Sequence, residues 1–179
     1  MAEENKYPLD YERRFGGVAK LYTKAGAERL KNAHVCVVGL GGVGSWAAEA
    51  LARTAVGRIT LVDLDNVAES NTNRQLQAMT GVYGKPKVDA TAERIHAINP
   101  LCDCRKIEDF IEVETAESLL PEDAIILDCI DNVKVTKEAF SVSNPAVDDT
   151  GDMITAAVDV KNYIYNVSGL GDNAPEVSP

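Results

Sequence analysis

The chain has 179 residues, of which 45% are hydrophobic and 26% charged, and its formal net charge is −10 at pH 7. These values are typical of one globular domain, and no apolar run reaches the ~20 residues that a membrane-spanning helix needs. The polar residues 1–6 lack the apolar region of a signal peptide, so we expect a cytoplasmic protein with no membrane partner. The negative net charge argues against binding of nucleic acid through a diffuse positive surface.

The first segment, residues 1–33, is expected to form an N-terminal helical arm. Between residues 9 and 33, apolar side chains recur with roughly helical spacing among charged ones, at Val18, Leu21, Tyr22 and Leu30. This spacing predicts an apolar stripe along the arm. Residues 34–38 (HVCVV) follow and predict a short buried strand.

A glycine-rich turn, GLGGVG at residues 39–44, separates this strand from a helix-like segment that begins at Ser45. Gly39 permits the tight turn, Gly41 lets backbone N–H groups approach a phosphate, and Gly44 removes a Cβ that would hold the helix off the strand. Gly42 is assigned to the same phosphate site. The N-terminus of the helix adds oriented donors and the positive end of its dipole, so the pattern predicts a bound nucleotide.

The remaining elements alternate between strand and helix. Strands are expected at 59–62, 102–107 and 124–130, a polar loop at 67–83, a helix from Pro86 to Ile98 and a short helix near 115–120. This alternation predicts an α/β fold with a Rossmann-like, mostly parallel sheet and helices on both faces. We assign residues 34–144 to this domain. A further helix is expected near 133–143, and a helix or strand near 153–167.

The four cysteines, at positions 36, 102, 104 and 129, have the spacing of neither a zinc site nor a disulfide framework. Because alternate residues of a strand face the same side, Cys102 and Cys104 are expected to point together. We interpret all four as small core residues in a reducing compartment.

Asp63 together with the charged residues that follow it indicates whether the ligand is NAD or ATP. An acidic residue about 20 positions after the glycines binds ribose hydroxyls in dinucleotide folds, so Asp63 by itself favours an NAD oxidoreductase. Arg74 and Lys87, however, place fixed cations near the strand ends, which suits a triphosphate and which hydride transfer does not need. Asp128 and Asp131 end the last strand, where a carboxylate is a natural Mg²⁺ ligand. Simpler interpretations stay open for each residue: helix caps, solvated charges and Asx turns.

Seven motifs in order resemble one known superfamily over roughly residues 10–132. They are Arg14-Phe15, GLGGVG at 39–44, DLDNV at 63–67, SNTNRQ at 70–75, GKPK at 84–87, INP at 98–100 and DCIDN at 128–132. The set resembles the ATP-binding half of the ubiquitin-activating (ThiF-MoeB-HesA) superfamily, which includes the adenylyltransferases of molybdopterin and thiamine synthesis. Residues 13–22, 41–54 and 71–75 look most like tRNA threonylcarbamoyladenosine dehydratases.

This resemblance implies ATP and Mg²⁺ as cofactors, and a homodimer. It implies that Asp63 holds the ribose with Asp65 in the same site, that Asn71, Arg74 and Lys87 contact the phosphates, that Asp131 coordinates Mg²⁺, and that Arg14 reaches the nucleotide of the partner subunit. The implied reaction is adenylation of a carboxylate. In the dehydratases this is the threonylcarbamoyl group of tRNA N6-threonylcarbamoyladenosine, which then closes to a cyclic product without a protein nucleophile.

The sequence leaves two other functions possible, and its C-terminal part departs from the superfamily pattern. The chain is also compatible with an adenylyltransferase of a small sulfur-carrier protein, or with a non-catalytic nucleotide-binding scaffold; an NAD oxidoreductase ranks last. Residues 145–179 are expected to form a short, divergent, acidic segment, with a piece of the substrate-binding half missing between about Pro145 and Ile154. Any tRNA contact is therefore expected through another surface or a partner chain.

Overall fold

The computed structural model describes residues 9–130, except for the side chains of residues 113 and 114. The elements expected at 133–143 and 153–167, the segment 145–179 and Asp131 lie outside these residues. Within them, no helix is long and apolar enough to cross a membrane.

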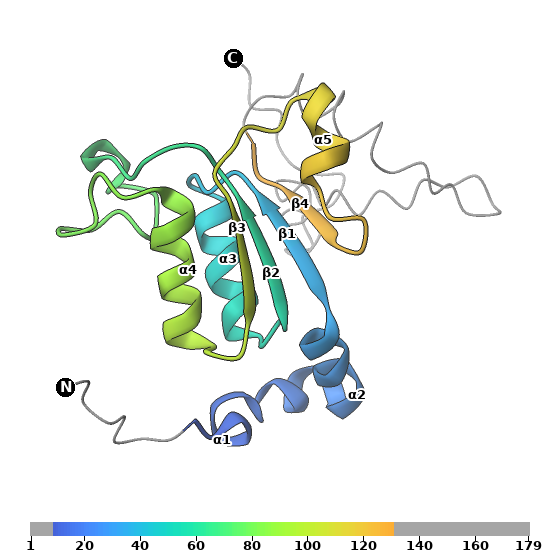
Figure 1. Cartoon of the computed structure of the whole chain (residues 1–179). Helices are drawn as coiled ribbons and strands as arrows, with labels where there is room; N and C mark the ends of the chain where they lie inside the picture. The colour runs from blue at the N-terminus through green and yellow to red at the C-terminus, as the bar shows by residue number, and fades with distance from the viewer. Residues whose placement is uncertain (1–8, 131–179) are drawn as a thin grey trace, which may run out of the picture.

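Four parallel strands form the sheet at the centre of the molecule (Figure 1). They are β1 (His34–Val38), β2 (Arg58–Val62), β3 (Asp103–Ile107) and β4 (Ile125–Asp128), in the spatial order β3-β2-β1-β4. The chain thus leaves β1 for a neighbour on one side and later returns to its other side. Val38 pairs with both Val62 and Asp128, so β1, β2 and β4 end at the same edge of the sheet. Open parallel sheets bind ligands at such an edge.

Helices cover both faces of the sheet, as the sequence predicts. On one face α3 (Gly44–Arg53) and α4 (Lys87–Ile98) pack side by side against Val35 and Val37 (Figure 1). The alternate β1 residues, Cys36 and Val38, face a second apolar cluster that includes residues of α5 (Val113–Leu119). Strand β1 is buried along its whole length, which explains why every residue after His34 is apolar, and the buried ring of His34 is hydrogen-bonded to Asp123 and Thr60.

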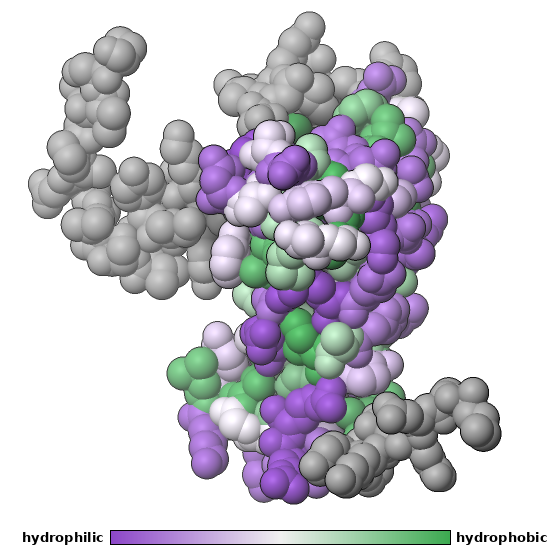
Figure 2. Space-filling view, turned by 90° about the vertical axis from the view of Figure 1, so that its left-hand side faces the viewer, coloured by the Kyte–Doolittle hydropathy of each residue, from purple (hydrophilic) through white to green (hydrophobic). Residues whose placement is uncertain are grey.

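The N-terminal arm consists of α1 (Tyr11–Phe15) and α2 (Val18–Asn32), as expected, but its predicted apolar stripe is wrong. Leu21 is 75% exposed and Tyr22 is also exposed, and no residue of α2 is buried. The cause is a break at Thr23, whose φ of 68° interrupts the helix, so residues before and after it do not share one face. Figure 2 accordingly shows hydrophobic surface on the arm, at the bottom of the view.

The end of the arm is tied to the sheet by backbone contacts. The N–H of Gly57 donates to the Leu30 carbonyl at 3.2 Å and the N–H of Arg58 donates to the Ala33 carbonyl at 3.1 Å. A Cβ on Gly57 would overlap the Lys31 carbonyl oxygen, so glycine permits this close approach.

Three further elements differ in detail from the sequence expectation. Pro86 precedes α4 as its N-cap and does not lie in the first turn. The loop at 67–83 contains a short 3-10 helix, η1 (Glu69–Asn71). Strand β4 is shorter than the expected 124–130. Cys102 and Cys104 do face the same side, toward the cluster under α3 and α4, and all four cysteines are free thiols.

Candidate nucleotide-binding site

A pocket of about 530 Å³ lies at the edge where β1, β2 and β4 end. It brings together most of the residues that the sequence assigned to a nucleotide site. These are Gly39, Gly41, Gly42, Asp63, Asp65, Asn71, Arg74 and Lys87. Its volume is typical of a small-molecule site.

The glycine turn adopts the conformation that the sequence predicts. Gly39 has a φ of +87°, which L side chains rarely adopt, and a Cβ there would lie 3.0 Å from the Cys129 carbonyl oxygen. A Cβ on Gly44 would overlap the carbonyl oxygen of Gly39. Gly44 does not line the pocket; its lack of a side chain lets the N-terminus of α3 approach the end of β1, behind Gly41 and Gly42.

Asp63 links the ends of β1 and β2. Its Oδ2 accepts from the N–H of Leu40 at 2.6 Å and its Oδ1 accepts from the N–H of Asp65 at 2.8 Å. The side chain is 9% exposed and lines the pocket. An ionised carboxylate has about four acceptor positions, so Asp63 keeps acceptor capacity for ligand hydroxyls while it holds the turn.

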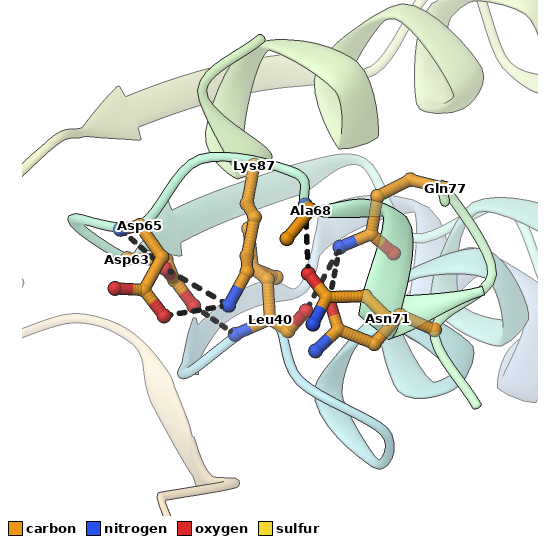
Figure 3. A network of polar contacts seen from close by, with 8 residues as sticks. Leu40, Asp63, Asp65, Ala68, Asn71, Gln77 and Lys87 are labelled. Atoms are coloured by element: carbon orange, nitrogen blue, oxygen red, sulfur yellow. Dashed lines mark hydrogen bonds and ion pairs between the residues drawn. The ribbon is translucent and has the colours of Figure 1, made fainter. Parts of the chain in front are cut away.

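Lys87 supplies a largely buried cation at the first residue of α4. Its Nζ lies 2.7 Å from Oδ2 of Asp65 and 3.8 Å from Oδ1 of Asp63 (Figure 3). The lysine side chain is 6% exposed, whereas that of Asp65 is 63% exposed. Lys87 lines the pocket and its carboxylate partner is mostly exposed to solvent, so an anion that enters the pocket can compete with Asp65 for the ammonium.

Arg74 supplies a second, exposed cation from the loop after η1. Its Nη1 donates to the Ser70 carbonyl at 3.1 Å and to Oδ1 of Asn73 at 3.0 Å. The aliphatic part lies beside the glycine turn, since a Cβ on Gly42 would be 3.5 Å from Cγ of Arg74. The indole N–H of Trp46, on α3, donates to the Arg74 carbonyl at 3.1 Å and holds the loop against that helix.

Asn71 combines a local role with a free donor. Its Oδ1 accepts from the N–H of Ala68 at 2.9 Å, a contact back to the residue that precedes η1 and not the Asx turn considered from the sequence (Figure 3). Within residues 9–130 its amide nitrogen makes no recorded hydrogen bond, and Asn71 lines the pocket. The assignment of Asn71 to the phosphates stays a prediction that depends on this nitrogen.

Arg14 lies far from the pocket of its own chain. Its Nη1 donates to the carbonyl of Ile98 at 2.8 Å, at the C-terminal end of α4, whereas Lys87 begins that helix. A helix of this length separates the two ends by about 16 Å. A role for Arg14 at the nucleotide of the same chain is therefore inconsistent with this arrangement, and the role at a partner's nucleotide stays a prediction.

The metal site predicted at Asp131 lies outside the described residues. In the described part of the chain no group of three or more His, Cys, Asp or Glu side chains is placed to hold a metal ion. Ile130, the residue before Asp131, lines the pocket. Its N–H donates to Oδ1 of Asp128 at 3.0 Å. The magnesium assignment thus stays a prediction.

Several pocket residues were missed from the sequence. Phe110 is 57% exposed and Leu64 is 40% exposed, and both line the pocket from segments that follow β3 and β2. Their place directly after strands was the available signal. Cys129 also lines the pocket; burial and the nearby Asp128 raise the pKa of its thiol to about 12, so the thiol is neutral at physiological pH.

Comparison with known proteins identifies the family. The ThiF family profile matches residues 11–161. The chain belongs to the ThiF family. This result confirms the resemblance found in the motifs, and the parallel sheet confirms the expected Rossmann-like fold.

Two ThiF-type relatives and one solved structure show how far the likeness extends. The tRNA threonylcarbamoyladenosine dehydratase of Haemophilus influenzae is 48% identical over 126 residues, which cover 70% of this chain and 48% of that protein. The crystal structure of the Escherichia coli dehydratase in complex with ATP superimposes with a TM-score of 0.70 at 42% identity, covering 74% of this chain and 55% of that one. The molybdopterin-synthase adenylyltransferase of Salmonella typhimurium is 33% identical over 145 residues, which cover 79% of this chain and 58% of that protein. The chain spans about half the length of the dehydratase relatives that it matches.

Proposed function

We propose that the chain binds ATP in the candidate pocket and uses it to activate a carboxylate as an acyl adenylate. One observation carries this proposal: the pocket places the glycine turn and the N-terminus of α3 together with two cations, Arg74 and Lys87. Backbone donors, a helix dipole and fixed cations suit a triphosphate. The similarity to a dehydratase that was crystallised with ATP supports the same ligand.

The proposed chemistry requires charge stabilisation and positioning. A carboxylate oxygen of the substrate attacks the α-phosphorus, the bond from that phosphorus to the bridging oxygen breaks, and pyrophosphate leaves with the electron pair. Lys87 and Arg74 balance the charge that develops on the phosphate oxygens. We assign Asp131 to Mg²⁺, which would offset the charge of the triphosphate; the adjoining Ile130 lines the pocket.

The substrate that we propose is the threonylcarbamoyl group of tRNA N6-threonylcarbamoyladenosine, which gives the cyclic dehydrated product. The identity of 48% with a dehydratase supports this choice over other carboxylates. Ring closure within the substrate displaces AMP without a protein nucleophile, and the raised pKa of Cys129, about 12, is consistent with a thiol that takes no part. Because the chain has a formal net charge of −10, we expect a local basic surface or a partner chain to make the contact with tRNA.

A second candidate is the adenylation of the C-terminus of a small sulfur-carrier protein. The alignment with the molybdopterin-synthase adenylyltransferase supports this candidate, because it covers 79% of this chain. Pyrophosphate release separates the candidates: release with modified tRNA supports the dehydratase, release with a carrier ending in Gly-Gly supports the adenylyltransferase, and ATP binding without release supports a scaffold.

Calorimetric titration with Mg²⁺-ATP tests the ATP site directly. Arg74→Ala and Lys87→Ala should each raise the Kd for ATP by roughly tenfold or more, since each removes a charge-assisted contact. Lys85→Ala is the matched control, because Lys85 pairs with the exposed Glu93 and does not line the pocket. Absence of ATP binding, or equal affinity in all three variants, would contradict the proposal. Stronger thermal protection by NAD than by ATP would restore the oxidoreductase hypothesis.

A further inference from the structure

The peptide groups on both sides of Leu40, inside the glycine turn, are held by two side chains (Figure 3). The N–H of Leu40 donates to Asp63, as described above, and its carbonyl accepts from Nε2 of Gln77 at 2.9 Å. Gln77 is 37 residues away in sequence and is only 1% exposed. It belongs to none of the motifs that pointed to a nucleotide.

The contact with Gln77 determines the direction of a donor in the turn. The described residues contain no cis peptide bond, so the carbonyl of Leu40 and the N–H of Gly41 point in opposite directions across one planar peptide group. Gln77 holds the carbonyl and lies outside the pocket, whereas Gly41 lines the pocket. Rotation of this peptide group would turn the N–H of Gly41 away from a bound phosphate.

The other half of the same amide suggests that stability alone does not explain this glutamine. Oε1 of Gln77 has no hydrogen-bond partner among the described residues, and neither has the hydroxyl of Thr91. Both residues border one small gap between α3 and α4. The unpartnered Oε1 lowers stability, so this amide is not optimised for packing, whereas its Nε2 satisfies the buried carbonyl of Leu40.

We propose that Gln77 is a positioning residue: it fixes the Leu40–Gly41 peptide group so that the N–H of Gly41 points at the phosphates. This inference rests on the proposed ATP site. Gln77 does not touch the nucleotide and acts through the backbone of the turn. A merely structural role predicts that substitution changes stability and leaves the ATP affinity of the folded variant unchanged.

The first test is Gln77→Met, which keeps an unbranched side chain of similar volume and removes the donor. Loss of the hydrogen bond should raise the Kd for Mg²⁺-ATP by roughly tenfold. The urea midpoint should also fall, because the buried carbonyl of Leu40 loses its partner, so the ATP affinity of the folded variant is the deciding measurement. Thr91→Val is the matched control, because it removes the other unpartnered atom of the same gap without touching the turn. Its ATP affinity should equal that of the unchanged chain.

The second test, Gln77→Glu, works even where the methionine variant does not fold. A neutral carboxyl donates an O–H to the Leu40 carbonyl, whereas the ionised form presents only acceptors. Relative to the unchanged chain at the same pH, its ATP affinity should fall as the pH is raised from about 5.5 to about 8.5.

The outcomes separate the two proposals. If the unchanged chain does not bind ATP, the proposed function fails. If it binds ATP and Gln77→Met binds equally well, the positioning role of Gln77 is wrong, whatever the change in stability. Where that variant does not fold, a relative affinity of Gln77→Glu that stays constant with pH overturns the role.

Discussion

Glu49 forms a charged link between two helices that cover the same face of the sheet. Its Oε1 accepts from Nε and Nη2 of Arg53 at 2.9 and 2.6 Å, and its Oε2 accepts from Nε of Arg94, on α4, at 3.0 Å. Burial raises the pKa of Glu49, but the hydrogen bonds and charges of the two guanidinium groups outweigh it and lower the pKa below its usual value. The carboxylate thus stabilises the α3–α4 contact in its ionised form.

Glu49→Gln should lower the free energy of unfolding by about 2 kcal/mol at pH 7, because it removes charge-assisted hydrogen bonds from a side chain that is 10% exposed. The folded pKa lies below the unfolded value of about 4.3, so the stabilisation is present above that pH and is lost as the pH falls through the folded pKa. The difference between variant and unchanged chain, measured by urea unfolding, should therefore shrink from pH 7 to pH 3.5.

The matched control for this prediction is Glu93→Gln on α4. The carboxylate of Glu93 is 67% exposed and pairs with Lys85, so its loss should cost at most about 0.5 kcal/mol. Equal destabilisation by both changes, or a Glu49→Gln effect that does not depend on pH, would show that the Glu49 link is not ionic in origin.

At the scale of elements, the position of helix α3 depends on Gly44, because an added Cβ there would overlap the Gly39 carbonyl oxygen. Gly44→Ala should shift α3 off the sheet end, reduce stability by about 2 kcal/mol and weaken ATP binding. Fluorescence of Trp46, the single tryptophan of the chain, follows unfolding from within α3 itself.

Gly17→Ala is the control for Gly44→Ala. Gly17 has helical φ and ψ of −63° and −26°, and a Cβ there meets nothing within 4 Å. Alanine should leave stability unchanged or raise it by up to about 1 kcal/mol. Unchanged stability and ATP affinity of Gly44→Ala would contradict the packing role of Gly44.

The order of elements and most of the pocket could be predicted because both depend on strong local signals. Apolar runs mark the strands, and parallel strands bring the residues after them, such as Asp63 and Asp128, to one edge. The break at Thr23 could not be predicted, since a β-branched residue is disfavoured at positive φ. Gln77 could not be found either, because a glutamine in a polar loop is normally exposed.

For the molecule as a whole, the distance between Arg14 and the pocket has a consequence for assembly. We propose that the chain forms the homodimer that the family resemblance implies and that each ATP site combines Arg74 of one copy with Arg14 of the other. Arg14→Ala and Arg74→Ala should each weaken ATP binding alone. When the two variants are mixed and allowed to exchange subunits, half of the dimers contain one copy of each variant. Each such mixed dimer has one intact site out of two, so high-affinity binding should return at about a quarter of all sites.

Calorimetric stoichiometry measures this restored fraction. The unmixed variants, handled identically, are the control. No recovery in a mixture whose subunits exchange would show that Arg14 does not act between copies, and a monomer by light scattering would contradict the dimer itself.

The strand order also affects how prone the chain is to aggregate during its synthesis. The central strand β1 pairs on one side with β2, which follows after α3, but on its other side Val35 pairs with Ile125, which is synthesised about 90 residues later. At ~5–20 residues per second the ribosome needs roughly 5 to 18 seconds for that length. Throughout this interval an apolar strand destined for the interior exposes an unpaired edge, so nascent chains are most prone to aggregate before residue 125 has emerged.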